Sequence, residues 1–155
     1  MKGKYLLMSV ILLLLFMQCK NCLETSNYYN KQDQKSVHAI LKILDDHSIS
    51  TEDKMDVWVD DLVHMAPGHP IITEKTSLIK HINNEKQYGT AEMKHEMIEM
   101  HSYDQIVVMH GKVRGVFFSA NKDVSDNFET KNIFVFRRMK DNSLKIWKVI
   151  FNMTS

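Results

Sequence analysis

The chain has 155 residues, of which 44% are hydrophobic and 25% are charged, and its formal net charge is +1. This composition is typical of a single globular domain with a segment attached in front of it. The near-neutral charge, without a basic stripe, excludes a nucleic-acid-binding surface. The only two cysteines, Cys19 and Cys22, precede every plausible folded element, so they cannot form a core disulfide or a zinc cluster. We expect no metal and no cofactor.

The first residues have the pattern of an export signal. Lys2 and Lys4 form a short basic start, and an apolar run follows from Tyr5 to Met17. About 13 apolar residues are too few for a membrane span, which needs about 20. A cysteine directly after such a run is typical of a bacterial lipoprotein signal, which predicts cleavage before Cys19 and lipidation of that residue. A plain secretory signal and an uncleaved anchor remain the alternatives.

These features predict three segments. Residues 1–18 are the signal peptide, 19–34 a polar tether without periodicity, and 35–155 the folded domain. The mature protein is expected to be exported and anchored to the bacterial membrane through its lipid alone, or else to be periplasmic or secreted. Loss of residues 1–18 would change the formal charge from +1 to −1, because Lys2 and Lys4 are removed.

Three helices are predicted at the start of the domain. Val37, Ile40, Leu41 and Leu44 recur with the spacing of one apolar helix face, and this helix ends near residues 46–47. Ser50 or Thr51 caps a short second helix, which Trp58 ends on its buried side. The third helix covers residues 73–84 and is capped by Thr73.

The segment between the second and third helices combines several distinct signals. Asp60 and Asp61 provide a polar break after the helix, and residues 62–65 form a short strand. Pro67, Gly68 and Pro70 place a turn over residues 66–72.

The second half of the chain has the period of β-strands. Residues 93–101 alternate, and 106–119 are β-branched and aromatic. Residues 132–138 and 144–152 are two further runs, joined by a turn at Asp141 and Asn142. Three helices followed by long antiparallel strands indicate an α+β fold.

The pattern over Trp58–Pro70 resembles the SnoaL-like and ketosteroid-isomerase-like proteins of the nuclear-transport-factor-2-like superfamily, and within it the domain-of-unknown-function 4440 group. Val113–Gly115, Arg137–Ile146 and Ile150–Asn152 match later motifs of the same group. The resemblance implies a cone-shaped, curved antiparallel sheet wrapped around three N-terminal helices. It also implies a pocket between the concave face of the sheet and the helices.

Alternation along residues 106–119 indicates which side chains face that pocket. Gly111, Val113, Gly115 and Phe117 share the concave face, whereas Lys112, Arg114 and Phe118 are expected on an outer face that meets a partner subunit. The predicted ligand pocket is apolar and rich in methionine, a flexible residue that adapts to varied ligands. Its predicted lining residues are Trp58, His64, Met65, Met97, Val113 and Phe117.

The catalytic groups that the resemblance implies for a ketosteroid isomerase are missing. The position of the isomerase base, directly before Pro67, is occupied by Ala66. The two positions of its oxyanion-stabilising groups are occupied by Phe134 and Lys42. His64 is the remaining catalytic candidate, because it lies on the short strand beside the missing base and an imidazole titrates near neutrality.

Three functions therefore stay open. The first is a non-catalytic domain that binds a small apolar or amphipathic molecule. The second is a ketosteroid-isomerase-like or cyclase-like enzyme that uses His64 with Tyr88 or Tyr103. The third is a dimerisation or interaction domain, for example a homodimer formed through the outer face of the sheet. We expect the first function.

Overall fold

The structure is a computed structural model that describes residues 30–120 and 124–154. The chain divides into two units, Met1–Gln32 and Asp33–Ser155, and the second unit contains the sheet and the helices discussed below. The predicted signal peptide and Cys19 lie outside the described residues. Within the described ranges, none of the helices has the length and apolarity that a membrane crossing requires.

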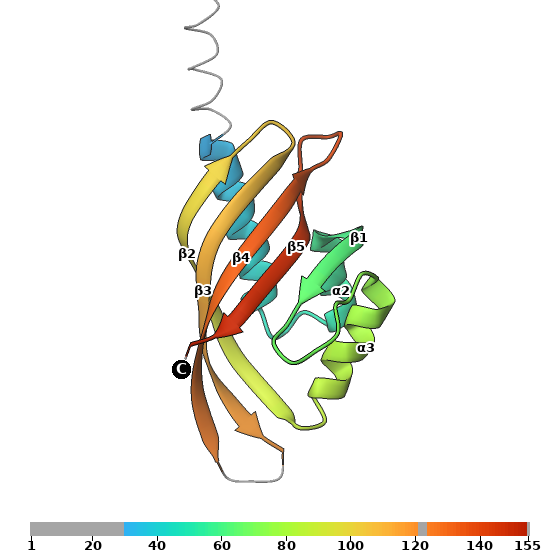
Figure 1. Cartoon of the computed structure of the whole chain (residues 1–155), viewed down its shortest axis with the longest axis vertical. Helices are drawn as coiled ribbons and strands as arrows, with labels where there is room; N and C mark the ends of the chain where they lie inside the picture. Colours follow the sequence, from blue (N-terminus) through green and yellow to red (C-terminus); the bar gives the residue numbers. More distant parts are fainter. Residues whose placement is uncertain (1–29, 121–123, 155) are drawn as a thin grey trace, which may run out of the picture. The chain divides into compact units, whose positions relative to one another are not determined.

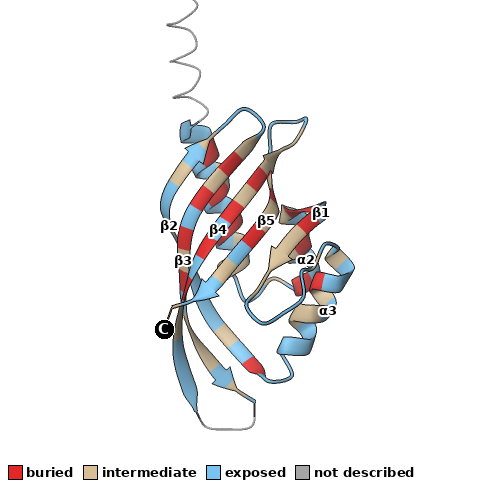
Figure 2. Ribbon diagram, in the orientation of Figure 1, coloured by how far each residue is buried: buried red, intermediate tan, exposed pale blue. Residues whose placement is uncertain are grey.

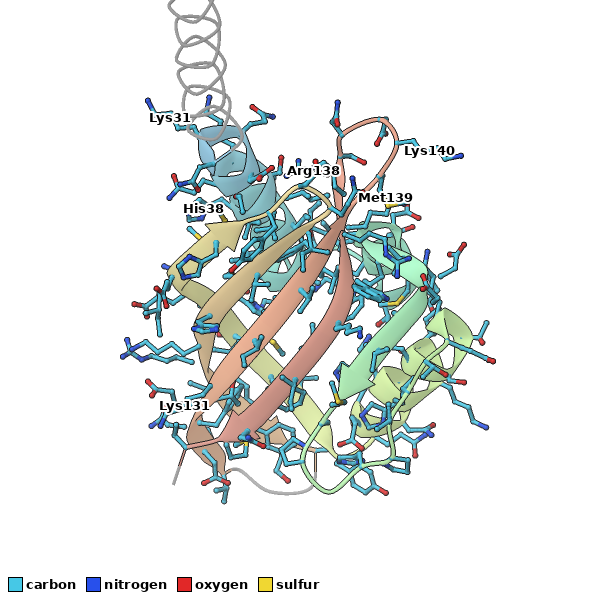
Figure 3. The ribbon with its side chains drawn as sticks, turned by 45° about the horizontal axis from the view of Figure 1, so that its top comes forward. Lys31, His38, Lys131, Arg138, Met139 and Lys140 are labelled. Atoms are coloured by element: carbon cyan, nitrogen blue, oxygen red, sulfur yellow. The ribbon has the colours of Figure 1, made fainter. Side chains whose placement is uncertain are left out.

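The first helix begins earlier than the sequence analysis predicts. Its predicted apolar face is confirmed, because Val37, Ile40 and Leu41 are buried. Residues 30–34, which the sequence analysis assigns to the tether, are already helical. The physical reason is a buried ion pair, which a search for apolar periodicity does not detect. Asp33 is 1% exposed and accepts two hydrogen bonds of 2.8 Å from the guanidinium of Arg138. Figure 3 shows Arg138 at the end of the sheet beside this helix.

The second helical segment is shorter than predicted. Ser50 caps helix α2 (Thr51–Lys54) through its side chain, as expected, and a 3₁₀ turn η1 (Met55–Val57) follows. Trp58 caps the end of this 3₁₀ turn and is also the first residue of strand β1 (Trp58–Met65). Asp60 and Asp61 lie within β1, where the register with the neighbouring strand shifts between Trp58 and Val63. This irregularity turns both carboxylates to solvent, where they pair with Lys75 and Arg137.

A turn and a short β-bridge connect β1 to helix α3 (Lys75–Glu85). Pro67 and Gly68 occupy the centre of the predicted turn, and Gly68 has a positive φ of 75°, as position i+2 of a type II turn requires. His64 and Ile72 then exchange two backbone hydrogen bonds of 2.8 and 3.0 Å. Because this bridge keeps the chain extended, α3 begins two residues later than predicted, and Glu74 takes the cap position instead of Thr73.

The predicted α+β fold is confirmed, with a curved, unclosed sheet of five strands (Figure 1). The remaining strands are β2 (Gly89–Ser102), β3 (Ile106–Ser119), β4 (Ser125–Arg138) and β5 (Leu144–Met153). The strand order is β1-β5-β4-β3-β2, and only β1 runs parallel to its neighbour. The N-terminal helix lies across one face of β2, β3 and β4 in Figure 1, and α2 and α3 lie beside β1.

Buried residues alternate with accessible ones along β3 and β4, and they concentrate at the ends of these strands near the N-terminal helix (Figure 2). A bulge changes this alternation in β5: Val135 pairs with Lys148 and Phe136 with Ile146, so Trp147 has no partner in β4. Val149 is therefore buried, whereas Ile150, which the simple alternation would place inward, is exposed.

Candidate functional site

A cavity of about 670 Å³ lies between the concave face of the sheet and the helices. Its walls are mostly apolar, and Val113, Phe128 and Phe134 form part of the sheet side. Helix α3 contributes Ile82 and Glu85 to the opposite side. A volume of this size matches the clefts in which proteins hold small organic molecules.

Four of the six predicted pocket residues line this cavity. They are Trp58, His64, Val113 and Phe117. Met65 and Met97 do not line it: Met65 ends β1, and Met97 packs against the core beside a second, shallower groove. The methionines that line the cavity are Met55 and Met93. The cavity is therefore less rich in methionine than predicted.

His64 is partly buried and has no polar partner among the described residues. Its Nδ1 atom and the Nε1 atom of Trp58 are both inaccessible, and neither makes a hydrogen bond with the described residues. Burial, with smaller contributions from the neighbouring His81 and His69, lowers the pKa of His64 to about 4. The imidazole is thus neutral at pH 7, and none of the carboxylates that the structure describes pairs with it.

His95 has the partner that His64 lacks. Its Nδ1 atom lies 2.6 Å from Oδ1 of Asp45, which is at the end of the N-terminal helix. The backbone N–H of His95 also donates to the two carboxylate oxygens, at 3.0 and 3.2 Å. With Asp45 ionised, Nδ1 carries the proton and Nε2 keeps its lone pair. Nε2 makes no hydrogen bond with the described residues, and His95 lines the cavity.

Burial is the main influence on the pKa of His95 and lowers it, whereas the hydrogen bond and the charge of Asp45 act in the opposite direction. The lowered pKa keeps the imidazole neutral at pH 7, which is the state that accepts a proton. The ring also meets the phenyl ring of Phe134 edge-on, with 5.7 Å between centroids. The imidazole of His95 therefore contacts a carboxylate on one side and an aromatic ring on the other.

Hydrogen-bond donors occupy the wall across the sheet from His95. The carboxamide oxygen of Asn132 accepts a hydrogen bond from the hydroxyl of Thr130. The NH₂ group of Asn132 has no partner among the described residues. His95 pairs with Val113 and Val113 with Thr130, so two strand spacings, or about 10 Å, separate the backbone of His95 from that of Thr130.

Two lysines close the helical side. Lys54 donates a 2.7 Å hydrogen bond to the carbonyl oxygen of Leu44, and Lys86 donates one of 2.7 Å to the hydroxyl of Thr51. Burial lowers the pKa of Lys54. Both lysines line the cavity, so its residues include cations as well as neutral donors.

The pairing of His95 with Asp45 was not predicted from the sequence. The two residues are 50 positions apart, and neither belongs to a recognisable motif. The sequence contains only a weak indication of this pairing. The alternation of its strand places His95 on the inward face, and Asp45 lies near the predicted end of a helix. The tyrosines proposed as partners of His64 are exposed at the surface instead. Phe134 lines the cavity beside His95, whereas Lys42 lines the shallower groove.

No sequence-family model matches the chain, and no curated protein sequence matches it. Solved structures do match. A ketosteroid isomerase-like protein from Erwinia carotovora atroseptica SCRI1043 aligns with a TM-score of 0.69 at 16% identity, over 79% of this chain and 93% of that one. The hexachlorocyclohexane dehydrochlorinase LinA-type3 from Novosphingobium barchaimii LL02 aligns with a TM-score of 0.71 at 13% identity, over 84% and 92%.

A nuclear transport factor 2-like superfamily protein from Salmonella enterica serovar Typhimurium LT2 aligns with a TM-score of 0.67 at 6% identity, over 84% of this chain and 94% of that one. Identities this low carry the fold and not the activity. The element order, the curved sheet and these alignments agree with the resemblance that the sequence motifs suggest. The chain has the nuclear-transport-factor-2-like fold.

Proposed function

We propose that the domain binds a small apolar molecule in its cavity and removes a proton from a carbon of that molecule, with His95 as the base. The observation that carries this proposal is the 2.6 Å contact between His95 Nδ1 and Asp45 in the cavity wall. A carboxylate that fixes the tautomer of an imidazole leaves the other nitrogen ready to accept a proton.

The other cavity groups support the same chemistry. The free NH₂ group of Asn132 and the ammonium groups of Lys54 and Lys86 are able to stabilise the negative charge that develops when a C–H bond is broken. The chemistry agrees with the names of two proteins of similar fold, a ketosteroid isomerase-like protein and a dehydrochlorinase. The ligand is an uncharged or weakly anionic molecule of drug-like size or smaller, because the walls are mostly apolar.

A chromogenic carbon acid tests the base without knowledge of the natural ligand. In the Kemp elimination, a base removes the C3 proton of 5-nitrobenzisoxazole, and the N–O bond breaks to give a coloured cyanophenolate. We expect the protein to accelerate this reaction above buffer, and we expect His95→Gln to remove the acceleration. Asp45→Asn should lower the rate about 10²-fold or more, within the range typical of positioned acid–base groups.

His64 provides the matched control, since it also lines the cavity but has no carboxylate partner. His64→Gln should retain most of the rate. Equal rates for the parent and the His95→Gln variant would refute the proposed base. Binding of a small apolar ligand by both proteins, with no turnover by either, would favour the binding-only function.

We also infer export and a lipid anchor at Cys19, on the evidence of the N-terminal sequence alone.

A homodimer through the outer face of the sheet remains a further proposal. Its support is the chemistry of that face, where Arg114 and Glu129 pair at 2.6 Å beside the exposed apolar residues Ile133 and Ile150. The concentration dependence of the molecular mass in solution would test it.

A further inference from the structure

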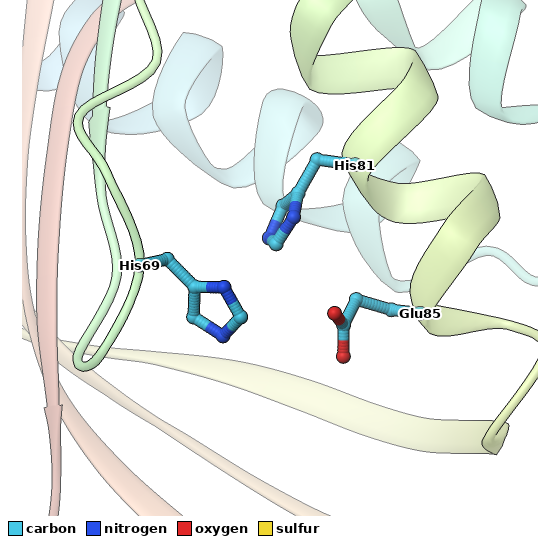
Figure 4. A group of neighbouring side chains, drawn as sticks. All are labelled: His69, His81 and Glu85. Carbon is cyan, nitrogen blue, oxygen red and sulfur yellow. The ribbon is translucent and has the colours of Figure 1, made fainter.

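We propose that His69, His81 and Glu85 form a binding site for Zn²⁺ or a similar late first-row divalent ion at the rim of the cavity. Their ligand atoms all lie within 4.8 Å of one another. Figure 4 shows the two imidazoles and the carboxylate pointing toward one common space between the β1–α3 loop and α3.

The backbone holds the three groups in place. His81 and Glu85 are four residues apart on α3, so they lie on one face, one turn apart. The fully buried Leu78 and the 2.9 Å ion pair between Lys75 and Asp60 attach this helix to the rest of the domain. The loop that carries His69 is fixed between the type II turn at residues 66–69 and the bridge that joins Ile72 to β1.

The three side chains have no competing partners. None of them makes a hydrogen bond or an ion pair with the residues that the structure describes. The rings of His69 and His81 meet edge-on with 4.8 Å between centroids.

The donor set selects the class of ion. Two imidazoles and one carboxylate are the ligands of zinc and of other late divalent transition metals, whereas Mg²⁺ and Ca²⁺ prefer oxygen alone. Tetrahedral zinc with bonds of about 2.0–2.1 Å places its ligand atoms about 3.3 Å apart. The ligand atoms of the three residues lie within 4.8 Å of one another, so binding would require them to move closer together.

The geometry leaves the fourth position of a tetrahedral ion open. Glu85 lines the cavity, so an ion held here would connect the β1–α3 loop to α3 at the rim and offer a free site to water or to an anionic group of a bound molecule. The site does not include His95 or Asp45, so the proposal is independent of the proposed base.

Calorimetric titration of the metal-stripped full-length chain with ZnCl₂ at pH 7.5 tests the site. Every protein should carry Cys19→Ser and Cys22→Ser, because these cysteines have the spacing of a zinc-binding pair. We expect one equivalent of Zn²⁺ to bind. His69→Gln, His81→Gln and Glu85→Gln should each weaken it about tenfold or more, as expected when a ligand of a three-ligand site is lost.

The matched control is His101→Gln. His101 also lies beside a glutamate, with 2.9 Å to Glu99, but it is on the sheet and outside the proposed site. Its substitution should leave stoichiometry and affinity unchanged. Thermal unfolding of the metal-free variants identifies any loss of fold, and His69→Gln and Glu85→Gln, both at exposed positions, are the variants least subject to it. Absence of binding, or equal binding by a His69→Gln/His81→Gln double variant, would overturn the proposal.

Discussion

The pair formed by Asp33 and Arg138 allows a direct test of how the N-terminal helix is fixed to the sheet. Both side chains are almost inaccessible, with exposed fractions of 1% and 9%, and both carboxylate oxygens accept a 2.8 Å hydrogen bond from the guanidinium. Removal of one partner from a buried pair leaves a desolvated charge and costs about 3–5 kcal/mol. We therefore expect Asp33→Ala to lower the free energy of unfolding by about that amount, a large part of the roughly 5–15 kcal/mol typical of a domain.

The chain contains a control of nearly identical geometry. Arg137 donates two hydrogen bonds of 2.7 and 2.8 Å to Asp61, but these side chains are 32% and 65% exposed. Exposed pairs contribute about 0–1 kcal/mol, because water solvates both partners after the pair is broken. Asp61→Ala should therefore cost less than about 1 kcal/mol, and the difference between the two variants isolates the effect of burial.

Urea unfolding at pH 7 measures both variants, provided that the m-value is unchanged. A double variant, Asp33→Leu with Arg138→Met, should recover most of the lost stability, since apolar residues of similar size avoid the buried charge. A chain that begins at residue 35, the predicted domain boundary, should be destabilised at least as much as Asp33→Ala. Equal, small costs for Asp33→Ala and Asp61→Ala would refute the reasoning.

Three other predictions concern the core, pH and the N-terminus. Trp58 is buried, so Trp58→Ala should cost about 3–5 kcal/mol in denaturant unfolding, and Trp147→Ala, at the half-exposed bulge, should cost less. Because burial lowers the pKa of His95 below that of the unfolded chain, the unfolded state binds more protons below about pH 6.5. The free energy of unfolding should therefore fall as the pH falls through that range, and less steeply in His95→Gln; equal slopes would contradict this. Finally, Cys19→Ser should abolish fatty-acid labelling and membrane attachment, and labelling that survives would exclude lipidation at this residue.

Features set by local periodicity were predictable from the sequence. The apolar face of the first helix and the inward residues of β3 follow from spacings of 3.6 and 2, which depend only on neighbouring residues. The Pro67–Gly68 turn was predictable for the same reason, since its backbone requirements are met by these two residues alone.

Features that depend on distant segments were not predictable. The bulge at Trp147 changes the phase of β5, and it arises from pairing with β4, not from the sequence of β5 itself. The helical start at residues 30–34 depends on an ion pair between positions 105 residues apart. The same holds for the candidate base, because nothing near His95 in the sequence indicates that Asp45 lies beside it.

The carboxylate of Asp45 has a second consequence, which concerns the outer edge of the sheet. Strand β2 is the last strand of the sheet, and an unpaired edge can add a strand from another molecule and begin aggregation. The outward backbone N–H of His95 is occupied by Asp45, so the N-terminal helix covers this point of the edge with a side chain. The residue that orients the candidate base thus also protects the sheet from intermolecular pairing. Loss of this carboxylate would expose a backbone donor at the edge as well as remove the partner of the imidazole.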